Sequence, residues 1–222
     1  MAFGGEDWLV KTLTIMIPLW LSLSVHEWAH AWSAWKLGDD TAARLGRMTL
    51  NPLAHIDPVG TLLLPLMGVP FGWAKPVPVQ PHRFTRRVTM RTGMMITAAA
   101  GPISNLVLAA ISIALLAAVV HLEIGTVQLR EALVKLLLTM IFMNSLLALF
   151  NLIPVPPLDG SRIADALVPE LLRPAWERFY SLGPIALIGL ILIPMFLGVR
   201  IFEWPLAILI HFLASLGLLP GL

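Results

Sequence analysis

The chain has 222 residues, of which 58% are hydrophobic and only 13% are charged, and its mean hydropathy is +0.84. Soluble globular domains carry about 25% charged residues, so the composition excludes that class and indicates an integral membrane protein. The absence of cysteine excludes disulfides, thiolate metal ligands and a cysteine nucleophile, and the net charge of +2 comes from basic residues beside apolar segments, which argues against nucleic acid as a partner.

The first apolar segment, Leu13–Trp35, is long enough to cross a bilayer and contains the sequence His26-Glu27-Trp28-Ala29-His30. Helical residues four apart lie on one face, so His26 and His30 can bind one zinc ion with Glu27 beside them as general base. Burying such groups in an apolar run costs on the order of several kcal/mol each unless a metal in a hydrated cavity compensates. The alternatives are a chance match and a polar patch between packed helices.

Two unusual elements follow. The apolar run Val59–Val69 is short and broken by glycine and proline, which predicts a re-entrant segment. The next stretch, Phe71–Pro81, predicts a short membrane-associated β-strand or hairpin, and its prolines at positions 76 and 78 remove the donors of one edge. The other edge could pair with an extended substrate, through Lys75, Val77 and Val79. The alternative is an ordinary proline-rich loop.

The second half predicts four more spans. Gly93–Val120 contains Asn105, a lone amide that serves either as a contact between helices or as a site residue. Leu133–Ile153 is followed by three prolines, which must break the helix before Asp159. Two spans interrupted by glycine or proline complete the chain: Leu182–Leu197 and Trp204–Leu218. The predicted fold is an all-α polytopic bundle of about five transmembrane helices in a single domain, residues 1–222.

Basic residues divide unequally between the two sides of this topology, and cytoplasmic loops carry the excess. One side holds eleven: Lys36, Arg44, Arg47, Lys75, Arg83, Arg86, Arg87, Arg91, Arg162, Arg173 and Arg178. The other holds four: Lys11, Arg130, Lys135 and Arg200. The imbalance predicts a multi-pass protein of the cell membrane, with the N-terminus outside and both His30 and Asp159 toward the cytoplasmic half.

A catalytic zinc ion needs three protein ligands and an open position for water. Asp159 is the preferred third ligand, because the direction of the preceding span returns it to the same face as His30. Asp57 and His55 compete, since both precede the re-entrant segment and could reach the site. The sequence therefore predicts one zinc ion per chain, and the candidates for its third ligand are Asp159, Asp57 and His55.

Peptide hydrolysis is the chemistry that this set favours. Zinc lowers the pKa of its water to about 7, Glu27 takes the proton and passes it to the leaving amine, and Asn105 and Asn151 are candidates for stabilising the oxyanion. The alternative is a metal permease or a catalytically silent membrane-binding protein. A permease is expected to line both halves of the membrane with polar groups, whereas these residues occupy one half.

Five segments together resemble the site-2 protease family of intramembrane zinc metalloproteases. Three resemble its core motifs: His26–His30, Gly101–Asn105 and Asn151–Gly160. Two more resemble the small prokaryotic members: Asn51–Pro58 and Gly72–Pro78. No loop is long enough for the PDZ domain that larger members carry.

The resemblance implies His26, His30 and Asp159 as metal ligands and Glu27 as the catalytic residue. It also implies substrates that are membrane-spanning proteins or remnant signal peptides, cut within regulated intramembrane proteolysis.

Overall fold

The structure is a computed structural model that describes residues 6–67, 72–85, 88–197 and 203–219, and every regular element in these ranges is helical. Three long helices dominate: α1 (Glu6–Lys36), α4 (Met90–His121) and α5 (Val127–Asn151). The shorter α-helices are α2 (Thr41–Arg44), α3 (Leu64–Leu66), α6 (Asp159–Leu167), α7 (Arg173–Tyr180), α8 (Pro184–Leu197) and α9 (Glu203–Ser215). Short turns of helix are η1 (Pro52–Ala54), η2 (Pro58–Leu63), η3 (Pro81–Arg83) and η4 (Glu170–Leu172). The predicted all-α class is confirmed.

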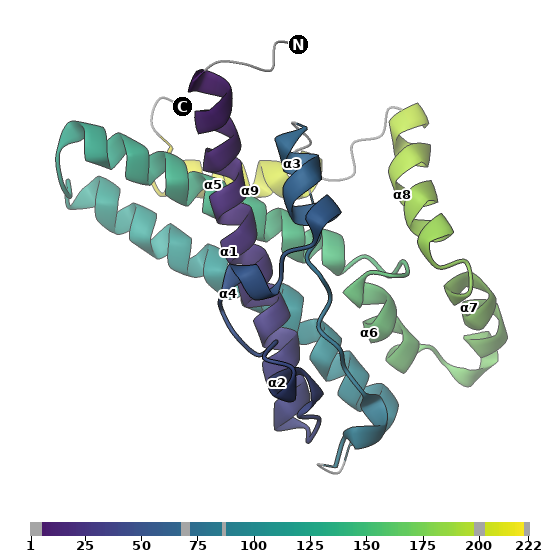
Figure 1. Ribbon diagram of the computed structural model, residues 1–222. Helices are drawn as coiled ribbons and strands as arrows, with labels where there is room; N and C mark the ends of the chain where they lie inside the picture. The colour runs from purple at the N-terminus through teal and green to yellow at the C-terminus, as the bar shows by residue number, and fades with distance from the viewer. Residues whose placement is uncertain (1–5, 68–71, 86–87, 198–202, 220–222) are drawn as a thin grey trace.

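Helices α4 and α5 form an antiparallel hairpin that crosses α1 (Figure 1). Their first turns are capped in the same way, because Thr89 accepts from the amide of Thr92 and Thr126 accepts from that of Leu129. Both helices are long and apolar enough to cross a membrane, with mean hydropathies of 2.5 and 2.1 over their most apolar stretches. This chain is a membrane protein.

The prediction of about five spans is only partly matched. The described parts of α8 and α9 have 14 and 13 residues, which is about 20 Å of helix against a hydrocarbon core of about 30 Å. The run that was predicted to be re-entrant forms η2 and α3, which pack beside α1, where Trp20 Nε1 donates to Thr61 O at 2.9 Å. Residues 68 and 69 of that run lie outside the described residues.

The predicted strand is not seen. Residues 72–80 are extended and run along α1 toward the start of α4 (Figure 1), without a ladder partner among the described residues. The backbone donors go elsewhere, since Lys75 N donates to His55 O at 2.9 Å and Gln80 N donates to Asp39 Oδ2 at 2.6 Å. Residue 71 lies outside the described ranges.

The end of this extended segment is fixed to the end of α1. Thr85 N donates to Leu37 O at 2.9 Å, and Arg83 lies 3.3 Å from the carboxylate of Asp40. The hydrogen bond from Arg44 holds the pKa of the Asp40 carboxyl below its usual range. The C-terminal end of α1 and the N-terminal end of α4 therefore lie together, at one end of the molecule.

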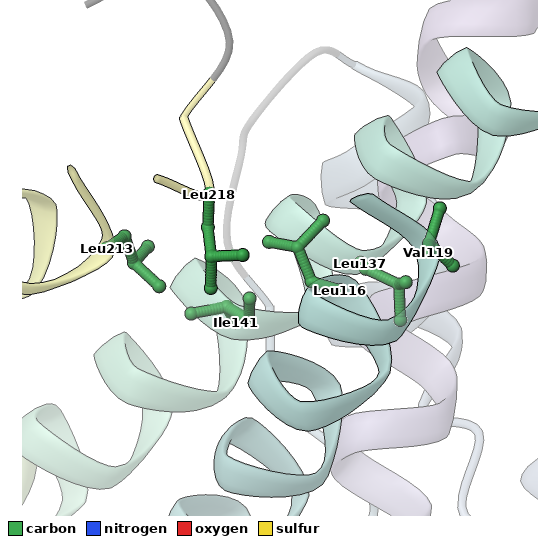
Figure 2. Packing of buried hydrophobic residues seen from close by; sticks show 6 residues of the cluster. All are labelled: Leu116, Val119, Leu137, Ile141, Leu213 and Leu218. Carbon is green, nitrogen blue, oxygen red and sulfur yellow. The ribbon is translucent and has the colours of Figure 1, made fainter. Parts of the chain in front are cut away.

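A buried apolar cluster joins α9 to the far end of the hairpin (Figure 2). Its members come from α4, α5 and the chain around α9: Leu116, Val119, Leu137, Ile141, Leu213 and Leu218. Leu116 is fully buried, whereas its neighbour Leu115 is 52% exposed.

We expect Leu116→Ala to lower the unfolding free energy by about 2–4 kcal/mol, because it leaves a cavity among packed helices. Thermal unfolding in detergent measures this, with Leu115→Ala as the control that removes the same atoms from the outer face. Equal losses for the two variants would contradict the assigned packing.

Candidate metal centre

Three ligand atoms from two distant segments converge inside the molecule. His26 and His30 lie one helical turn apart on α1, and their Nε2 atoms are 3.0 Å apart. Asp159 opens α6, and its Oδ2 lies 3.1 Å from His26 Nε2 and 3.3 Å from His30 Nε2. All three residues are buried.

Two glycines allow this approach. A Cβ at Gly160 would lie 2.3 Å from Leu152 O, so only glycine lets the start of α6 pack against the broken end of α5 and present Asp159. A Cβ at Gly101 would lie 2.5 Å from the His30 ring and 2.6 Å from the His26 ring. Gly101 therefore leaves the space in which both imidazoles stand.

Hydrogen bonds fix which ring nitrogens carry protons. His30 Nδ1 lies 2.7 Å from Thr97 O, a carbonyl that can only accept, so this nitrogen donates. His26 Nδ1 lies 2.6 Å from Asn105 Oδ1, and the Nδ2 of the same amide donates to Asn144 Oδ1 at 2.8 Å. With the proton on Nδ1, a neutral imidazole carries a lone pair on Nε2, and both Nε2 atoms are directed into the site.

Two lone-pair nitrogens and a carboxylate oxygen facing one another repel, and Asp159 Oδ2 has no hydrogen-bond donor among the described residues. A bound cation removes that repulsion. Tetrahedral zinc with bonds of about 2.0–2.2 Å places its ligand atoms about 3.3–3.6 Å apart, close to the separations found here. Two imidazoles and a carboxylate therefore fit zinc, and they leave its fourth position open.

Glu27 lies next to this set. A carboxylate oxygen of Glu27 lies within 4.8 Å of a ring nitrogen of His26 and of His30. By distance alone, Glu27 could therefore be a metal ligand. Its Oε2 instead accepts a hydrogen bond from Val77 N at 2.8 Å, and Asp159 stands closer to both imidazoles. The Asp159 carboxylate is therefore the one nearest to both imidazoles, and the Glu27 carboxylate lies beside this group.

The competing ligands are used elsewhere. Asp57 caps η2, accepting from Val59 N at 3.0 Å and Gly60 N at 2.8 Å. His55 is buried, and its Nε2 lies 2.8 Å from Thr49 O. Neither side chain joins the group around His26.

The two asparagines expected to stabilise an oxyanion make other contacts. Asn105 is fully buried, and its amide bonds to His26, Asn144 and Ser22 O, the last at 3.3 Å. Asn151 donates one amide proton to Leu147 O at 2.9 Å, within its own helix. An oxyanion role for Asn105 requires that one of its bonds be exchanged, whereas the Asn151 amide has a second proton.

Of the three residues predicted to bind substrate, two already donate within the protein. Lys75 N bonds to His55 O, and Val77 N bonds to Glu27. Val79 lies further along the extended segment and is partly buried.

Sequence reasoning missed Thr97 and Asn144. Thr97 contributes its backbone carbonyl, which no sequence pattern marks. Asn144 carries a visible signal, since it is a second lone amide in an apolar span, seven residues before Asn151.

Comparison with known proteins agrees with this geometry. The model of peptidase family M50 matches residues 116–193, which include Asp159. YwhC of Bacillus subtilis is 42% identical over 184 residues, covering 82% of this chain and 81% of its own. Rip2 of Mycolicibacterium smegmatis is 31% identical over 193 residues (85% and 68%), and Rip2 of Mycobacterium tuberculosis strain H37Rv is 32% identical over 199 (86% and 69%). All three are named as candidate zinc metalloproteases, and no solved structure matches.

A buried zinc-type ligand set with an adjacent glutamate, packed against helices that are long and apolar enough to cross a membrane, is typical of the class of intramembrane zinc metalloproteases. The chain belongs to peptidase family M50, the site-2 protease family.

We expect Gly101→Ala to weaken zinc binding by about tenfold or more, because the added methyl displaces both imidazoles. Zinc affinity can be measured by competition with a chromophoric chelator. Gly93→Ala is the matched control: it adds a methyl to the same helix against the Phe84 ring, eight residues or about 12 Å away. If Gly101→Ala binds zinc no more weakly than Gly93→Ala, the imidazoles do not need this space.

Proposed function

We propose that this enzyme hydrolyses peptide bonds within or next to membrane-spanning segments of other proteins, with His26, His30 and Asp159 holding one zinc ion and Glu27 acting as general base. One observation carries the proposal. The three acceptor atoms converge at 3.0–3.3 Å in a buried site directly beside Glu27. Burial of all four side chains excludes bulk water from the reacting groups.

The zinc ion would supply Lewis acidity, lowering the pKa of a bound water to about 7 and polarising the scissile carbonyl. The chain's own residues handle the proton. The Glu27 carboxylate accepts it from the attacking water, and the resulting carboxylic acid donates it to the leaving amine nitrogen. Asn105 Oδ1 and Thr97 O accept the Nδ1 protons of His26 and His30, which leaves each Nε2 atom directed at the metal position.

Oxyanion stabilisation is the step for which we propose Asn151, with Asn105 as the second candidate. Asn151 gives one amide proton to Leu147 O, and the chemistry of the amide provides a second. Asn105 would first have to release His26 or Asn144.

Residues 75–79 are proposed to bind the substrate as an extended strand. A peptide bond inside a transmembrane helix is shielded, so cleavage requires local unwinding, and the unwound backbone needs new hydrogen-bond partners. The Val77 amide now bonded to Glu27 stands at the catalytic carboxylate itself. Exchange of that bond for one to substrate would place the unwound segment beside the base.

The proposed topology is a single multi-pass domain, residues 1–222, with about five spans, a re-entrant segment around η2 and α3, an outside N-terminus and a cytoplasmic active site. It is supported by the basic residues gathered where α1 ends and α4 begins, among them Lys36, Arg44, Arg83 and Arg91. Arg86, Arg87 and Arg200 of the charge comparison lie outside the described residues. Membrane-protein anchors and remnant signal peptides are the proposed substrates, cut in regulated intramembrane proteolysis.

Glu27→Gln should retain zinc and lose cleavage of a model transmembrane substrate by at least about a hundredfold, since the amide cannot accept the proton. Zinc content and cleavage are measured together, with Glu131→Gln, an exposed residue, as control. Cleavage at the wild-type rate by Glu27→Gln would overturn the role of this carboxylate. Absence of cleavage by the wild type, with zinc bound, would favour a permease or a silent binding protein.

Val77→Pro should abolish cleavage and leave zinc content intact, because proline has no amide proton for a substrate strand or for Glu27. Val77→Ala is the control that trims the side chain and keeps the donor, and it should cleave at close to the wild-type rate. Normal turnover by Val77→Pro would remove the extended segment from the mechanism.

A further inference from the structure

Asn144 is a fully buried residue of α5 that the proposed mechanism does not use. Its side chain bonds to Asn105 and to Met140 O. We propose that Asn144 is a positioning residue for the metal centre, acting through Asn105 to keep the Nε2 atom of His26 unprotonated and directed at the metal. The inference rests on one part of the proposed function, namely that His26 is a metal ligand.

The polarity of this hydrogen-bond chain is set at its far end. Met140 O can only accept, so the Nδ2 of Asn144 donates to it at 2.8 Å, and this turns Oδ1 toward Asn105. The Nδ2 of Asn105 then donates to Asn144 at 2.8 Å, which leaves its own Oδ1 facing His26 Nδ1 at 2.6 Å. Each bond fixes the direction of the next, and the last places the proton on Nδ1.

Asn144 is the stronger of two restraints on the Asn105 amide. The other acceptor, Ser22 O, stands at 3.3 Å, against 2.8 Å for Asn144 Oδ1. Without Asn144, the Asn105 amide could rotate by half a turn and present Nδ2 to His26. That orientation stabilises the tautomer with the proton on Nε2, which cannot bind a metal. Both amides are fully buried, so water cannot take the missing role.

The test measures zinc affinity of the full chain in detergent by chelator competition. Asn144→Leu removes the acceptor at similar volume and should weaken zinc binding by about tenfold, within the range known for outer partners of metal ligands. Asn144→Asp should bind zinc almost as tightly as the wild type. A carboxyl buried there is neutral, its carbonyl oxygen accepts from Asn105, and its hydroxyl donates to Met140 O.

A double-mutant cycle separates this role from general loosening of the fold. If Asn144 acts through Asn105, adding Asn144→Leu to Asn105→Leu should weaken zinc binding no further. Ser112→Ala is the control, because Ser112 is a buried α4 residue whose hydroxyl bonds to Leu108 O within its own helix. It should leave zinc affinity unchanged.

Wild-type zinc affinity in Asn144→Leu, additive losses in the double variant, or an equal loss in Ser112→Ala would each overturn the inference. These outcomes are independent of the proteolysis assay. Failure of Glu27→Gln to lose cleavage would contradict the catalytic proposal and leave this zinc measurement as it stands.

Discussion

The fold depends on holding three mutually repelling acceptor atoms together in an apolar interior. One face of α4 does most of this work, because Thr97, Gly101 and Asn105 follow one another at four-residue spacing. α4 runs antiparallel to α1, so the carbonyl of Thr97 meets His30, Gly101 lies against both rings, and Asn105 meets His26. Helix α4 therefore positions the two histidines that α1 supplies.

The juxtaposition of His26 and His30 could be predicted from the sequence, because residues four apart on a helix lie on one face. Asp159 needed the topology as well, since its place depends on where α5 ends. Asn105 was expected either as a contact between helices or as a site residue, and its amide bonds both to Asn144 of α5 and to His26 of α1. Asn144 escaped prediction because its role depends on how α5 packs against α4, which no pattern within one segment specifies.

The strand was predicted because its prolines at positions 76 and 78 remove the amide donors from one edge only. Among the described residues, it has no second strand to pair with. A strand is defined by pairing, and the donors of Lys75 and Val77 are bonded to His55 O and Glu27 instead. The second span was predicted to within three residues of α4 at each end. The described part of α1 instead begins seven residues before Leu13, and α5 begins six residues before Leu133, at the cap formed by Thr126. Side-chain capping in a polar link is a weaker signal than apolar periodicity.

Under the proposed function and topology, the depth of the site would limit how much of a substrate helix must unwind. His30 lies six residues, or about 9 Å, before the end of α1 at Lys36, and Glu27 lies about 13 Å before it. In that topology, a substrate entering from that end would lose only two to three turns of helix before a peptide bond reached the carboxylate. Each turn that unwinds leaves backbone donors and acceptors for which the bilayer offers no partners. A site close to the end of α1 would limit how many of these groups are released, and the extended segment beside it would bond to some of them. Selection of substrates would then follow from how readily the end of their helix unwinds.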